Sequence, residues 1–376
     1  MTESYWLAEL AELAEPLAAA RIEGRPDVAV IGAGVTGCSC ALALAEGGLR
    51  VRVYEARRVA SGASGRNGGF ALRGGAMPYH EARDQLGGDG AAELWRLSEH
   101  YLERMKKLAG DALRHVGSLR LADDEEAEEL RAEFDALRED GFEADWLTEL
   151  VPPLDRLYRA AIRHPTDGAL HPARWVRRLA AWAVAAGAEI VEERRVESLD
   201  DLDAENVVIA TDGYTSGLVP ALDEVIRPVR GQVIVTAPLG AQLYSCPHYA
   251  RHGFDYWQQT PEGHLVLGGR RDASPDHEYT NEEGVTETIQ QALESFAEQL
   301  IGEPPQVMHR WSGIFGTTED RLPLVGPLPG RDGVWVAAGY SGHGNVLGLA
   351  CGELVAGAIL GRPPPELRLF EPARLL

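Results

Sequence analysis

Three closely spaced glycines near the start of the chain, Gly32, Gly34 and Gly37, could hold a phosphate group. In the pattern Gly-x-Gly-x-x-Gly the first glycine permits a tight turn. The second lets a pyrophosphate approach the backbone, and the third lets a helix pack against a strand. The amino terminus of that helix presents unpaired N–H groups to the phosphates. Glu55 ends the next apolar run, where a carboxylate can accept hydrogen bonds from ribose hydroxyls, so the spacing predicts a dinucleotide site.

The elements that must position these residues form a βαβ unit. Residues 28–31 are a short apolar run typical of a buried parallel strand. Residues 38–45 are small or apolar and suit a helix, and residues 51–54 predict a second strand that stops at Glu55. The connections are short, as is usual in such units.

The rest of the chain contains more elements of both kinds. Apolar runs predict further strands at 188–196, 206–210 and 334–339. We expect residues 90–145 to be helical and strongly charged, with solvated helix faces. Other helices are expected at 1–24 (acidic and amphipathic), 174–186, 283–300 and 347–360. After Arg227 the stretches 232–236, 254–259 and 264–268 indicate an antiparallel sheet.

These patterns predict a fold of class α/β plus α+β, in which a Rossmann-like domain is interrupted by a mostly antiparallel β domain with helices. The nucleotide-binding domain is expected to comprise residues 1–80, 150–220 and 325–376. The substrate-binding domain is expected to comprise residues 81–149 and 221–324.

Both NAD and FAD bind to such a unit, and three later segments favour FAD. The loop at 61–69 is rich in Gly and Ser and follows the carboxylate, so that it could wrap the pyrophosphate and reach a flavin ring. The strand at 206–210 ends in a Thr-Asp-Gly segment that can return to the nucleotide site. Residues 340–345 open the last helix with backbone amides suited to the electron-rich end of a reduced flavin. An NAD-dependent dehydrogenase is the less favoured alternative.

Two segments carry a resemblance to a known family: Ala-Ser-Gly-Arg-Asn-Gly-Gly at 63–69 and Ala-Gly-Tyr-Ser-Gly-His-Gly at 338–344. From Val28 to about Leu360 the chain resembles the D-amino-acid oxidase superfamily of FAD-dependent amine and amino-acid oxidoreductases. Glycine oxidase, sarcosine oxidase and γ-glutamylputrescine oxidase belong to it, and the two segments resemble the last branch most. The resemblance implies oxidation of the C–N bond of an amine or amino acid to an imine, with hydride transfer to flavin and O2 as acceptor.

The resemblance also implies a set of site residues. Its cofactor-binding residues fall on Gly32, Gly34, Val35, Thr36, Gly37, Glu55, Ala56, Arg57, Ser64, Arg66, Asn67, Gly68, Val196, Thr211, Gly213, Gly339, Gly342, His343, Gly344 and Asn345. The catalytic candidates beside the flavin and substrate are His343, Tyr340, Tyr256 and Phe315. No metal site is expected.

Departures from the family's pattern bear on the cofactor linkage and on the substrate. The segment at 311–320 aligns with the flavin-linking region of sarcosine oxidase and has no cysteine, so we expect non-covalent FAD. Two carboxylate-binding cations of relatives fall on Phe315 and Val346, which favours an amine, or an amino compound whose carboxylate lies away from the reacting carbon. An anchor could still come from Arg73, Arg270 or Arg271.

Aromatic residues of the antiparallel segment could form the wall of a substrate pocket. The candidates are Tyr249, Phe254, Tyr256 and Trp257, with Phe315 and Tyr340 nearer the flavin. As a group they could cage an amine by packing and by cation–π attraction.

Lysine is rare, and this affects the use of oxygen. The chain has two lysines, Lys106 and Lys107, both in the charged helical region. A positive charge near the flavin would then come from a protonated His343, from Arg251 or from His252. If none supplies it, the enzyme would be an FAD-dependent amino-acid or hydroxy-acid dehydrogenase with another acceptor. A non-catalytic FAD-binding scaffold is the alternative from a different class.

Composition excludes several partners. The formal net charge of −22 argues against nucleic acid, whose phosphates require an excess of Lys and Arg. No apolar run reaches the roughly 20 residues of a membrane span. The four cysteines show no metal-ligand spacing and favour a reducing, cytoplasmic setting. The expected partners are a small amine or amino-acid substrate and O2 or another electron acceptor.

Overall fold

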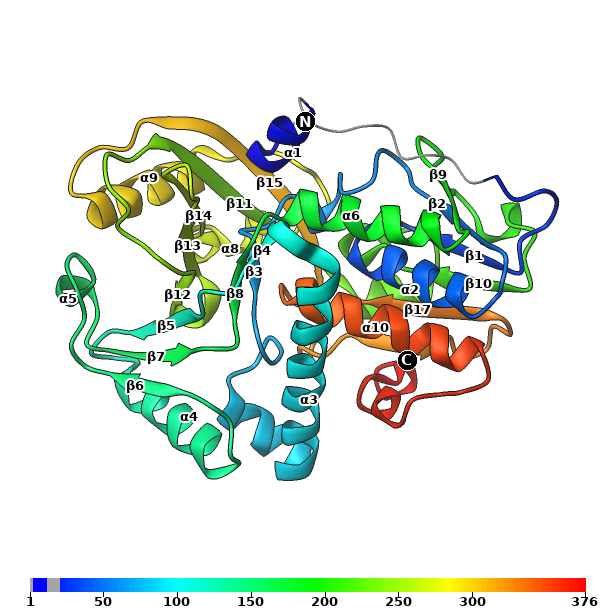
Figure 1. Cartoon of the computed structure of the whole chain (residues 1–376), viewed down its shortest axis with the longest axis horizontal. Helices are drawn as coiled ribbons and strands as arrows, with labels where there is room; N and C mark the ends of the chain where they lie inside the picture. Colours follow the sequence, from blue (N-terminus) through cyan, green and yellow to red (C-terminus); the bar gives the residue numbers. More distant parts are fainter. Residues whose placement is uncertain (1–2, 12–20) are drawn as a thin grey trace.

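The computed structural model has two large sheets, one on each side of the molecule (Figure 1). The structure describes residues 3–11 and 21–376. A six-stranded sheet with its helices lies on the right of the view, and an eight-stranded sheet lies on the left. The class predicted from the sequence, a Rossmann-like unit combined with a mostly antiparallel β region, is confirmed.

The six-stranded sheet is mainly parallel, as the apolar runs predict. Its strand order is β16 (Leu324–Pro327), β17 (Val334–Ala338), β10 (Asn206–Ile209), β1 (Val28–Ile31), β2 (Val51–Tyr54) and β9 (Glu189–Val191). Only β16 runs antiparallel to its neighbour. All four residues of β1 are buried, because helices cover a parallel sheet on its faces.

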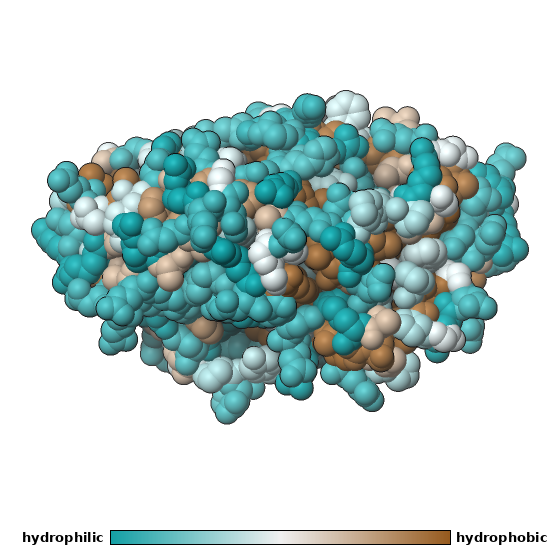
Figure 2. Space-filling model, turned by 90° about the horizontal axis from the view of Figure 1, so that it is seen from below, coloured by the Kyte–Doolittle hydropathy of each residue, from teal (hydrophilic) through white to brown (hydrophobic). Residues whose placement is uncertain are grey.

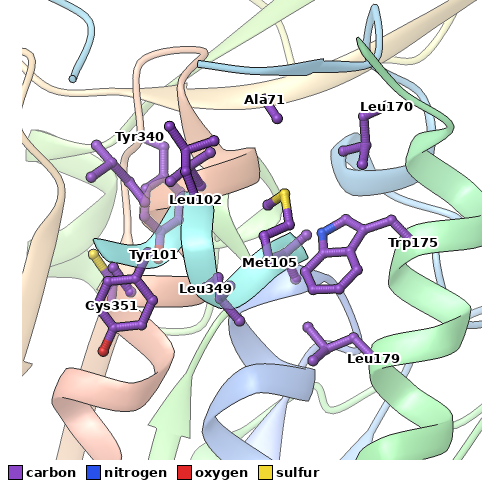
Figure 3. Packing of buried hydrophobic residues seen from close by; sticks show 14 of the residues in the cluster. Ala71, Tyr101, Leu102, Met105, Leu170, Trp175, Leu179, Tyr340, Leu349 and Cys351 are labelled. Carbon is purple, nitrogen blue, oxygen red and sulfur yellow. The ribbon is translucent and has the colours of Figure 1, made fainter. Parts of the chain in front are cut away.

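Helices rich in small residues cover one side of this sheet. In Figure 1, α2 (Val35–Glu46), α6 (Pro172–Ala185) and α10 (Gly344–Ile359) lie along it, with α3 (Tyr79–Ala109) beside them. α10 packs very closely on α2: a Cβ added to Gly352 would lie 2.6 Å from the carbonyl oxygen of Thr36. Figure 3 shows larger side chains filling the adjoining core, among them Met105, Trp175 and Leu349.

The eight-stranded sheet is almost entirely antiparallel. Its order is β15 (Val307–Thr317), β11 (Arg227–Pro238), β14 (His264–Gly269), β13 (Asp255–Gln259), β12 (His248–Ala250), β5 (Ser118–Ala122), β7 (Ala160–His164) and β6 (Asp145–Leu147). Only the β5–β12 pair is parallel. Helix α9 (Glu287–Ile301) covers one face and closes a second hydrophobic core.

Smaller elements complete the described part of the chain. A three-stranded sheet is made of β3 (Phe70–Ala71), β8 (Gly168–Leu170) and β4 (Leu113–Arg114). The remaining α-helices are α1 (Tyr5–Ala11), α4 (Ala127–Glu139), α5 (Leu154–Leu157), α7 (Pro220–Val225) and α8 (Pro275–Glu278).

Several expected elements differ from the observed ones. The region 90–145 is not helical throughout, because β4, β5 and β6 interrupt it, and β5 is an inner strand of the large sheet. The strand expected at 188–196 is limited to β9. The N-terminal helix is seen at Tyr5–Ala11, and residues 12–20 of that prediction lie outside the described residues. The expected division into nucleotide and substrate domains stays a proposal. It places residues 150–220 in the nucleotide-binding domain, whereas β7, at 160–164, pairs within the eight-stranded sheet.

The surface seen in Figure 2 is mostly hydrophilic, with smaller hydrophobic areas between the polar side chains. In the described ranges no helix combines the length and the apolar character that crossing a bilayer requires.

A buried histidine in the second core should make stability depend on pH. His248 is 3% exposed, and its ring stacks on Trp257 with centroids 5.2 Å apart. Burial lowers the pKa of His248 from 6.5 to about 4. Between these two values the unfolded chain binds a proton that the folded chain does not, so stability falls as the pH falls. We expect this residue to remove about 2 kcal/mol of unfolding free energy between pH 7.5 and pH 5.

The measurement is urea unfolding of wild type and His248→Phe at both pH values. Phenylalanine keeps the stacking but has no titrating group, so the difference between the two pH values should shrink by about 2 kcal/mol. The exposed His100→Asn serves as the control and should not change the difference. Equal pH dependence in wild type and His248→Phe would show that the prediction is wrong.

Candidate active site

A cavity of about 1660 Å³ lies where the two large sheets meet. Its walls combine the loops at the carboxyl ends of β1, β2 and β10 with one face of the eight-stranded sheet. Ligands of open α/β sheets bind at this edge of the strands. The cavity is larger than an ordinary pocket of roughly 300–1,000 Å³, so it has room for a dinucleotide and a substrate together.

The glycine-rich loop forms the phosphate end of the cavity. Gly32 has a φ of +101°, and a Cβ there would lie 2.6 Å from the carbonyl oxygen of Ala210. A Cβ on Gly34 would lie 2.8 Å from Ser64 Oγ. A Cβ on Gly37 would lie 1.8 Å from the carbonyl oxygen of Gly32, so glycine is required for the close packing of α2 on β1.

Glu55 closes the same end. Its Oε2 accepts a hydrogen bond from the Ala33 N–H at 2.9 Å, and its Oε1 accepts one from the Arg57 N–H at 2.9 Å. Two carboxylate oxygens offer about four acceptor positions, so acceptor capacity remains for a ribose on the cavity side. Helix α2 has Gly34 as its N-cap residue, without a side-chain capping bond from it. The Val35 N–H donates to Ser64 Oγ at 3.1 Å, and the next N–H groups of the first turn are open to a ligand.

A second helix opens on the cavity from the opposite end of the sequence. Helix α10 follows the turn of Ser341 and Gly342, whose φ angles are 51° and 93°. Its N-cap residue, His343, makes no side-chain capping bond. The amino ends of α2 and α10 therefore both direct partial positive charge into one cavity. With the glycine cradle and Glu55, these residues fit a dinucleotide cofactor with an electron-accepting ring.

Paired amides join the loop at 61–69 to the start of α10. Asn67 Nδ2 donates to Asn345 Oδ1 and Asn345 Nδ2 donates to Asn67 Oδ1, both at 3.1 Å. Asn345 Nδ2 also donates to the Phe70 carbonyl oxygen at 2.7 Å. This double contact holds together two segments that the resemblance places around the flavin.

Asp212 lines the cavity and is absent from the predicted site residues. Its Oδ1 accepts the N–H groups of Gly339 at 2.8 Å and Tyr340 at 3.3 Å, and its Oδ2 accepts the N–H of Gly316 at 3.0 Å. One carboxylate thus ties the ends of β10, β15 and β17 together. The Thr-Asp-Gly segment is a sequence signal for this position, but the resemblance implies Thr211 and Gly213, on either side of Asp212, as the site residues.

Glu283 links the antiparallel region to the nucleotide loops. Tyr214 Oη donates to its carboxylate at 2.5 Å, Arg57 Nη1 donates at 2.8 Å, and Arg66 Nη2 lies 3.5 Å away. Nothing in the sequence pairs Glu283 with these residues.

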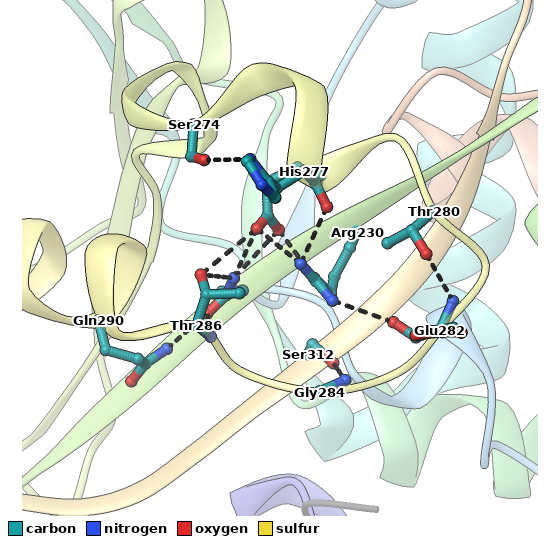
Figure 4. A network of polar contacts seen from close by, with 11 residues as sticks. Arg230, Ser274, His277, Thr280, Glu282, Gly284, Thr286, Gln290 and Ser312 are labelled. Atoms are coloured by element: carbon teal, nitrogen blue, oxygen red, sulfur yellow. Dashed lines mark hydrogen bonds and ion pairs between the residues drawn. The ribbon is translucent and has the colours of Figure 1, made fainter.

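The segment that carries Glu283 is fastened at both ends to the eight-stranded sheet (Figure 4). Arg230 on β11 forms an ion pair with Glu278 at 2.9 Å, and Gly284 N–H donates to Ser312 Oγ at 2.9 Å. Because its ends are held in this way, the segment can position Glu283 over the loops after β2 and β10.

Two tyrosines and an arginine share the cavity face of the eight-stranded sheet. Tyr256, Tyr249 and Arg120 are directly opposite one another on β13, β12 and β5, so they point to the same side. Gly268 leaves room for the Tyr256 ring, because a Cβ there would lie 2.4 Å from it. Burial raises the pKa of Tyr249 and of Tyr256 to about 12, so both phenols stay protonated. Glu133 neutralises Arg120 in a buried ion pair.

His343 is neutral in this environment. Burial, with smaller contributions from Arg120 and Arg271, lowers its pKa to about 4. Its Nδ1 has no hydrogen-bond partner among the described residues. A protonated His343 therefore does not supply the positive charge that the lack of lysines led us to expect. Arg251 and His252 also lie beside carboxylates, the former forming an ion pair with Asp272.

Most predicted site residues line the cavity, while a few lie behind its wall. Those at the cavity are Gly32, Gly34, Thr36, Glu55, Ala56, Arg57, Ser64, Arg66, Asn67, Gly68, Val196, Thr211, Tyr256, Phe315, Tyr340, Gly342, His343, Gly344 and Asn345. Val35, Gly37, Gly213 and Gly339 do not line it. The three glycines among them permit close approach: a Cβ on Gly213 would lie 2.6 Å from the Phe315 carbonyl carbon.

The predicted aromatic cage needs correction. Trp257 is fully buried in the second core with Tyr158, His248 and Phe296, on the side of β13 opposite to Tyr256. Its assignment to the pocket wall is wrong, because neighbouring residues of a strand face opposite ways.

Tyr340 is also held largely within the wall. It is 4% exposed, and its hydroxyl accepts a hydrogen bond from Thr36 Oγ1 at 2.8 Å. Of the predicted wall residues, Tyr249, Phe254, Tyr256 and Phe315 line the cavity, and the two tyrosines are the ones that also offer a hydroxyl to a substrate.

The fold and this cavity define a dinucleotide-binding oxidoreductase of the flavoprotein type. Residues 27–358 match the family described as FAD dependent oxidoreductase, or DAO, and the chain belongs to this family. It is therefore an FAD-dependent enzyme, as the resemblance of the two loop segments predicted.

Individual relatives support the same assignment. The chain is 27% identical to the probable oxidoreductase OrdL of Rhizobium meliloti, covering 93% of this chain and 86% of that protein. It is 28% identical to gamma-glutamylputrescine oxidoreductase of Escherichia coli, covering 89% and 84%. The crystal structure of glycine oxidase from Geobacillus kaustophilus matches with a TM-score of 0.74 and 26% identity, covering 90% and 95%.

Proposed function

We propose that the protein oxidises the C–N bond of an amine or amino acid to an imine, with O2 as the final electron acceptor. The observation that carries this proposal is the continuity of the cavity. One space joins the phosphate cradle and the amino end of α10 to the face with Tyr249 and Tyr256. A substrate on that face would lie against the ring end of the cofactor.

Bound FAD would supply the hydride acceptor, and the imine would then hydrolyse to a carbonyl compound and ammonia or an amine. The chain's own contribution is orientation and electrostatics. Tyr249 and Tyr256 stay neutral and can hydrogen-bond a substrate without adding charge. The apolar part of the cavity wall favours the neutral form of an amine, the form that can give up hydride without a catalytic base. The N–H groups at the start of α10 would stabilise negative charge at the cofactor ring.

We further propose that FAD is held without a covalent bond. Cys38, Cys40, Cys246 and Cys351 are buried free thiols, and none is a cavity residue among those described. Such unpaired thiols also support the cytoplasmic setting that we propose for the protein.

The preferred substrate is proposed to be an amine, or an amino compound with its carboxylate away from the reacting carbon. Phe315 and Val346 are uncharged residues of the cavity wall. Among the relatives, the name of gamma-glutamylputrescine oxidoreductase indicates an amine substrate of this kind. An FAD-dependent dehydrogenase that uses another acceptor is the second candidate, because burial keeps His343 neutral.

Anaerobic mixing with amines and amino acids tests this function. We expect primary and secondary amines such as putrescine derivatives to bleach the visible flavin absorbance, with kcat/KM about tenfold or more above that of glycine, sarcosine and D-alanine. Readmitted air should restore the absorbance if O2 is the acceptor. If no amine or amino acid reduces the flavin, the proposal is wrong. A tenfold preference for the small α-amino acids would contradict the substrate part alone.

A further inference from the structure

We propose that helix α1 is part of the cofactor site, and that Trp6 is a positioning residue which holds the flavin loop in place from behind the cavity wall. The flavin loop is the segment 61–69, between β2 and β3. This inference goes beyond the proposed function, because it concerns how the cofactor is held, whichever substrate is oxidised. Helix α1 precedes the first strand of the nucleotide-binding unit and belongs to neither large sheet.

Two side chains at the start of the described chain donate to the flavin loop. Trp6 Nε1–H donates to the Asn67 carbonyl oxygen at 2.9 Å, and Ser4 Oγ donates to the Gly65 carbonyl oxygen at 3.2 Å. Trp6 is 2% exposed and Ser4 is buried, so water does not compete for either bond. Each bond joins residues 61 positions apart, and it therefore depends on the tertiary packing of α1.

Helix α1 is itself fixed to both halves of the molecule, between β15 and α6 (Figure 1). On the side of the eight-stranded sheet, the centroid of the Tyr5 ring lies 5.3 Å from that of His264 on β14. On the other side, the Trp6 ring centroid lies 5.0 Å from that of His171, the N-cap residue of α6. His171 Nε2 lies 2.9 Å from Glu9 Oε2. These contacts give α1 a fixed place from which it can hold the loop.

The other carbonyl groups of the flavin loop are held in the same way. Trp311 Nε1–H on β15 donates to the Arg66 carbonyl oxygen at 2.8 Å. Gln258 Nε2 on β13 donates to the carbonyl oxygens of both glycines that follow Asn67, each at 2.7 Å. Five consecutive carbonyl oxygens, those of residues 65–69, therefore accept bonds from side chains. None of these donors is a cavity residue among those described, so the bonds lie behind the wall.

This arrangement turns N–H groups of the loop toward the cavity. The peptide unit is planar and trans, so the N–H of a residue points away from the carbonyl group before it. Because the Arg66 and Asn67 carbonyl oxygens are held behind the wall, the N–H groups of Asn67 and Gly68 face the other side, and both residues line the cavity. Neither N–H has an acceptor among the described residues, so both are open to the cofactor. The bond from Trp6 thus fixes the direction of the Gly68 N–H.

The first test measures the affinity of the apoprotein for FAD. Trp6→Phe keeps an aromatic ring but lacks the Nε1–H, so one carbonyl group of the loop is no longer held. We expect this variant to bind FAD about threefold to tenfold more weakly than wild type, the effect of one hydrogen bond. Ser4→Ala removes the neighbouring bond and should weaken FAD binding in the same direction.

Trp335→Phe is the matched control. Trp335 Nε1–H donates to Asn206 Oδ1 at 2.9 Å, at the first residue of β10 and so at the strand end remote from the cavity. This variant loses a bond of the same kind and length as that of Trp6, but it does not touch the flavin loop. Its FAD affinity should equal that of wild type.

The second test follows the flavin and the loop without any substrate. An N–H beside the ring stabilises the negative charge of the reduced cofactor. Trp6→Phe should therefore move the flavin midpoint potential to more negative values, and Trp335→Phe should not. In wild type, FAD should slow hydrogen–deuterium exchange in the peptide that contains residues 66–70, because the N–H groups of Asn67 and Gly68 would then be bonded.

The outcomes separate a positioning role from a merely structural one. A shift of FAD affinity or potential in Trp6→Phe that Trp335→Phe does not show supports the proposal. A lower Tm of the Trp6→Phe apoprotein, with FAD affinity and potential as in wild type, overturns it. Absence of FAD-dependent protection at residues 66–70 also overturns it. If Trp6→Phe does not fold, Ser4→Ala and the exchange measurement decide by the same criteria.

Discussion

Replacing Gly34 with valine is expected to yield a folded protein without flavin. The backbone of Gly34 has φ −81° and ψ −169°, which any residue can adopt, so the change does not strain the chain itself. A Cβ there would already lie 2.8 Å from Ser64 Oγ, and the two methyl groups would fill the space through which a pyrophosphate approaches. We expect FAD affinity to fall by more than about a hundredfold, because the phosphates would lose their contacts with the start of α2.

The flavin-to-protein absorbance ratio after purification measures the effect, and a thermal melt shows whether the apoprotein is folded. Gly240→Val is the matched control, since a Cβ at Gly240 meets no atom within 4 Å. In the wild type, acid precipitation should leave the flavin in the supernatant. Flavin in the pellet would contradict non-covalent binding, and a fully yellow Gly34→Val protein would contradict the role of the glycine loop.

Replacing Asp212 with alanine should cause the largest loss of stability at the site. Three backbone N–H groups, those of Gly316, Gly339 and Tyr340, would lose their acceptor. Asp212 also has a φ of 47°, in the left-handed region that alanine disfavours. Together these effects should cost about 3–5 kcal/mol of unfolding free energy and reduce the flavin content.

Two further variants separate the causes. Asp212→Gly relieves the backbone but still lacks the carboxylate, so most of the loss should remain. Asp212→Asn tolerates the left-handed backbone and keeps one acceptor oxygen, so it should lose least. Urea unfolding and flavin content of the three variants are the measurements. Stability of Asp212→Ala equal to that of Asp212→Asn would mean that the carboxylate does not hold the three loops together.

The sequence alone determined the nucleotide half of this protein. The βαβ unit is local in the chain, and the steric needs of Gly32 and Gly37 follow from backbone geometry that any sheet-helix junction shares. The apolar runs at β1, β10 and β17 are long enough to mark buried parallel strands. These signals were sufficient for the fold class and most cavity residues of the phosphate end, whereas the FAD-dependent family followed from the resemblance of the segments at 63–69 and 338–344.

The tertiary structure alone decided the polar contacts that complete the site. Asp212 and Gly339 are 127 positions apart, and Arg57 and Glu283 are 226 apart. Such pairs leave no spacing to recognise, because their closeness depends on how the two sheets pack. Within the part of the chain that the structure describes, the same packing leaves Arg271 without a carboxylate partner, while Arg270 next to it pairs with Asp255.

Aromatic residues that are neighbours in the sequence show the same limit of prediction from the sequence. Alternation in a strand shows that Tyr256 and Trp257 face opposite ways, but both are aromatic, so their types do not show which one enters the core. Helix α9 covers the Trp257 face of the sheet, where Phe296 packs against Trp257. Tyr256 is therefore left to the cavity, because burial against a helix, rather than the local sequence, selects the face that becomes core.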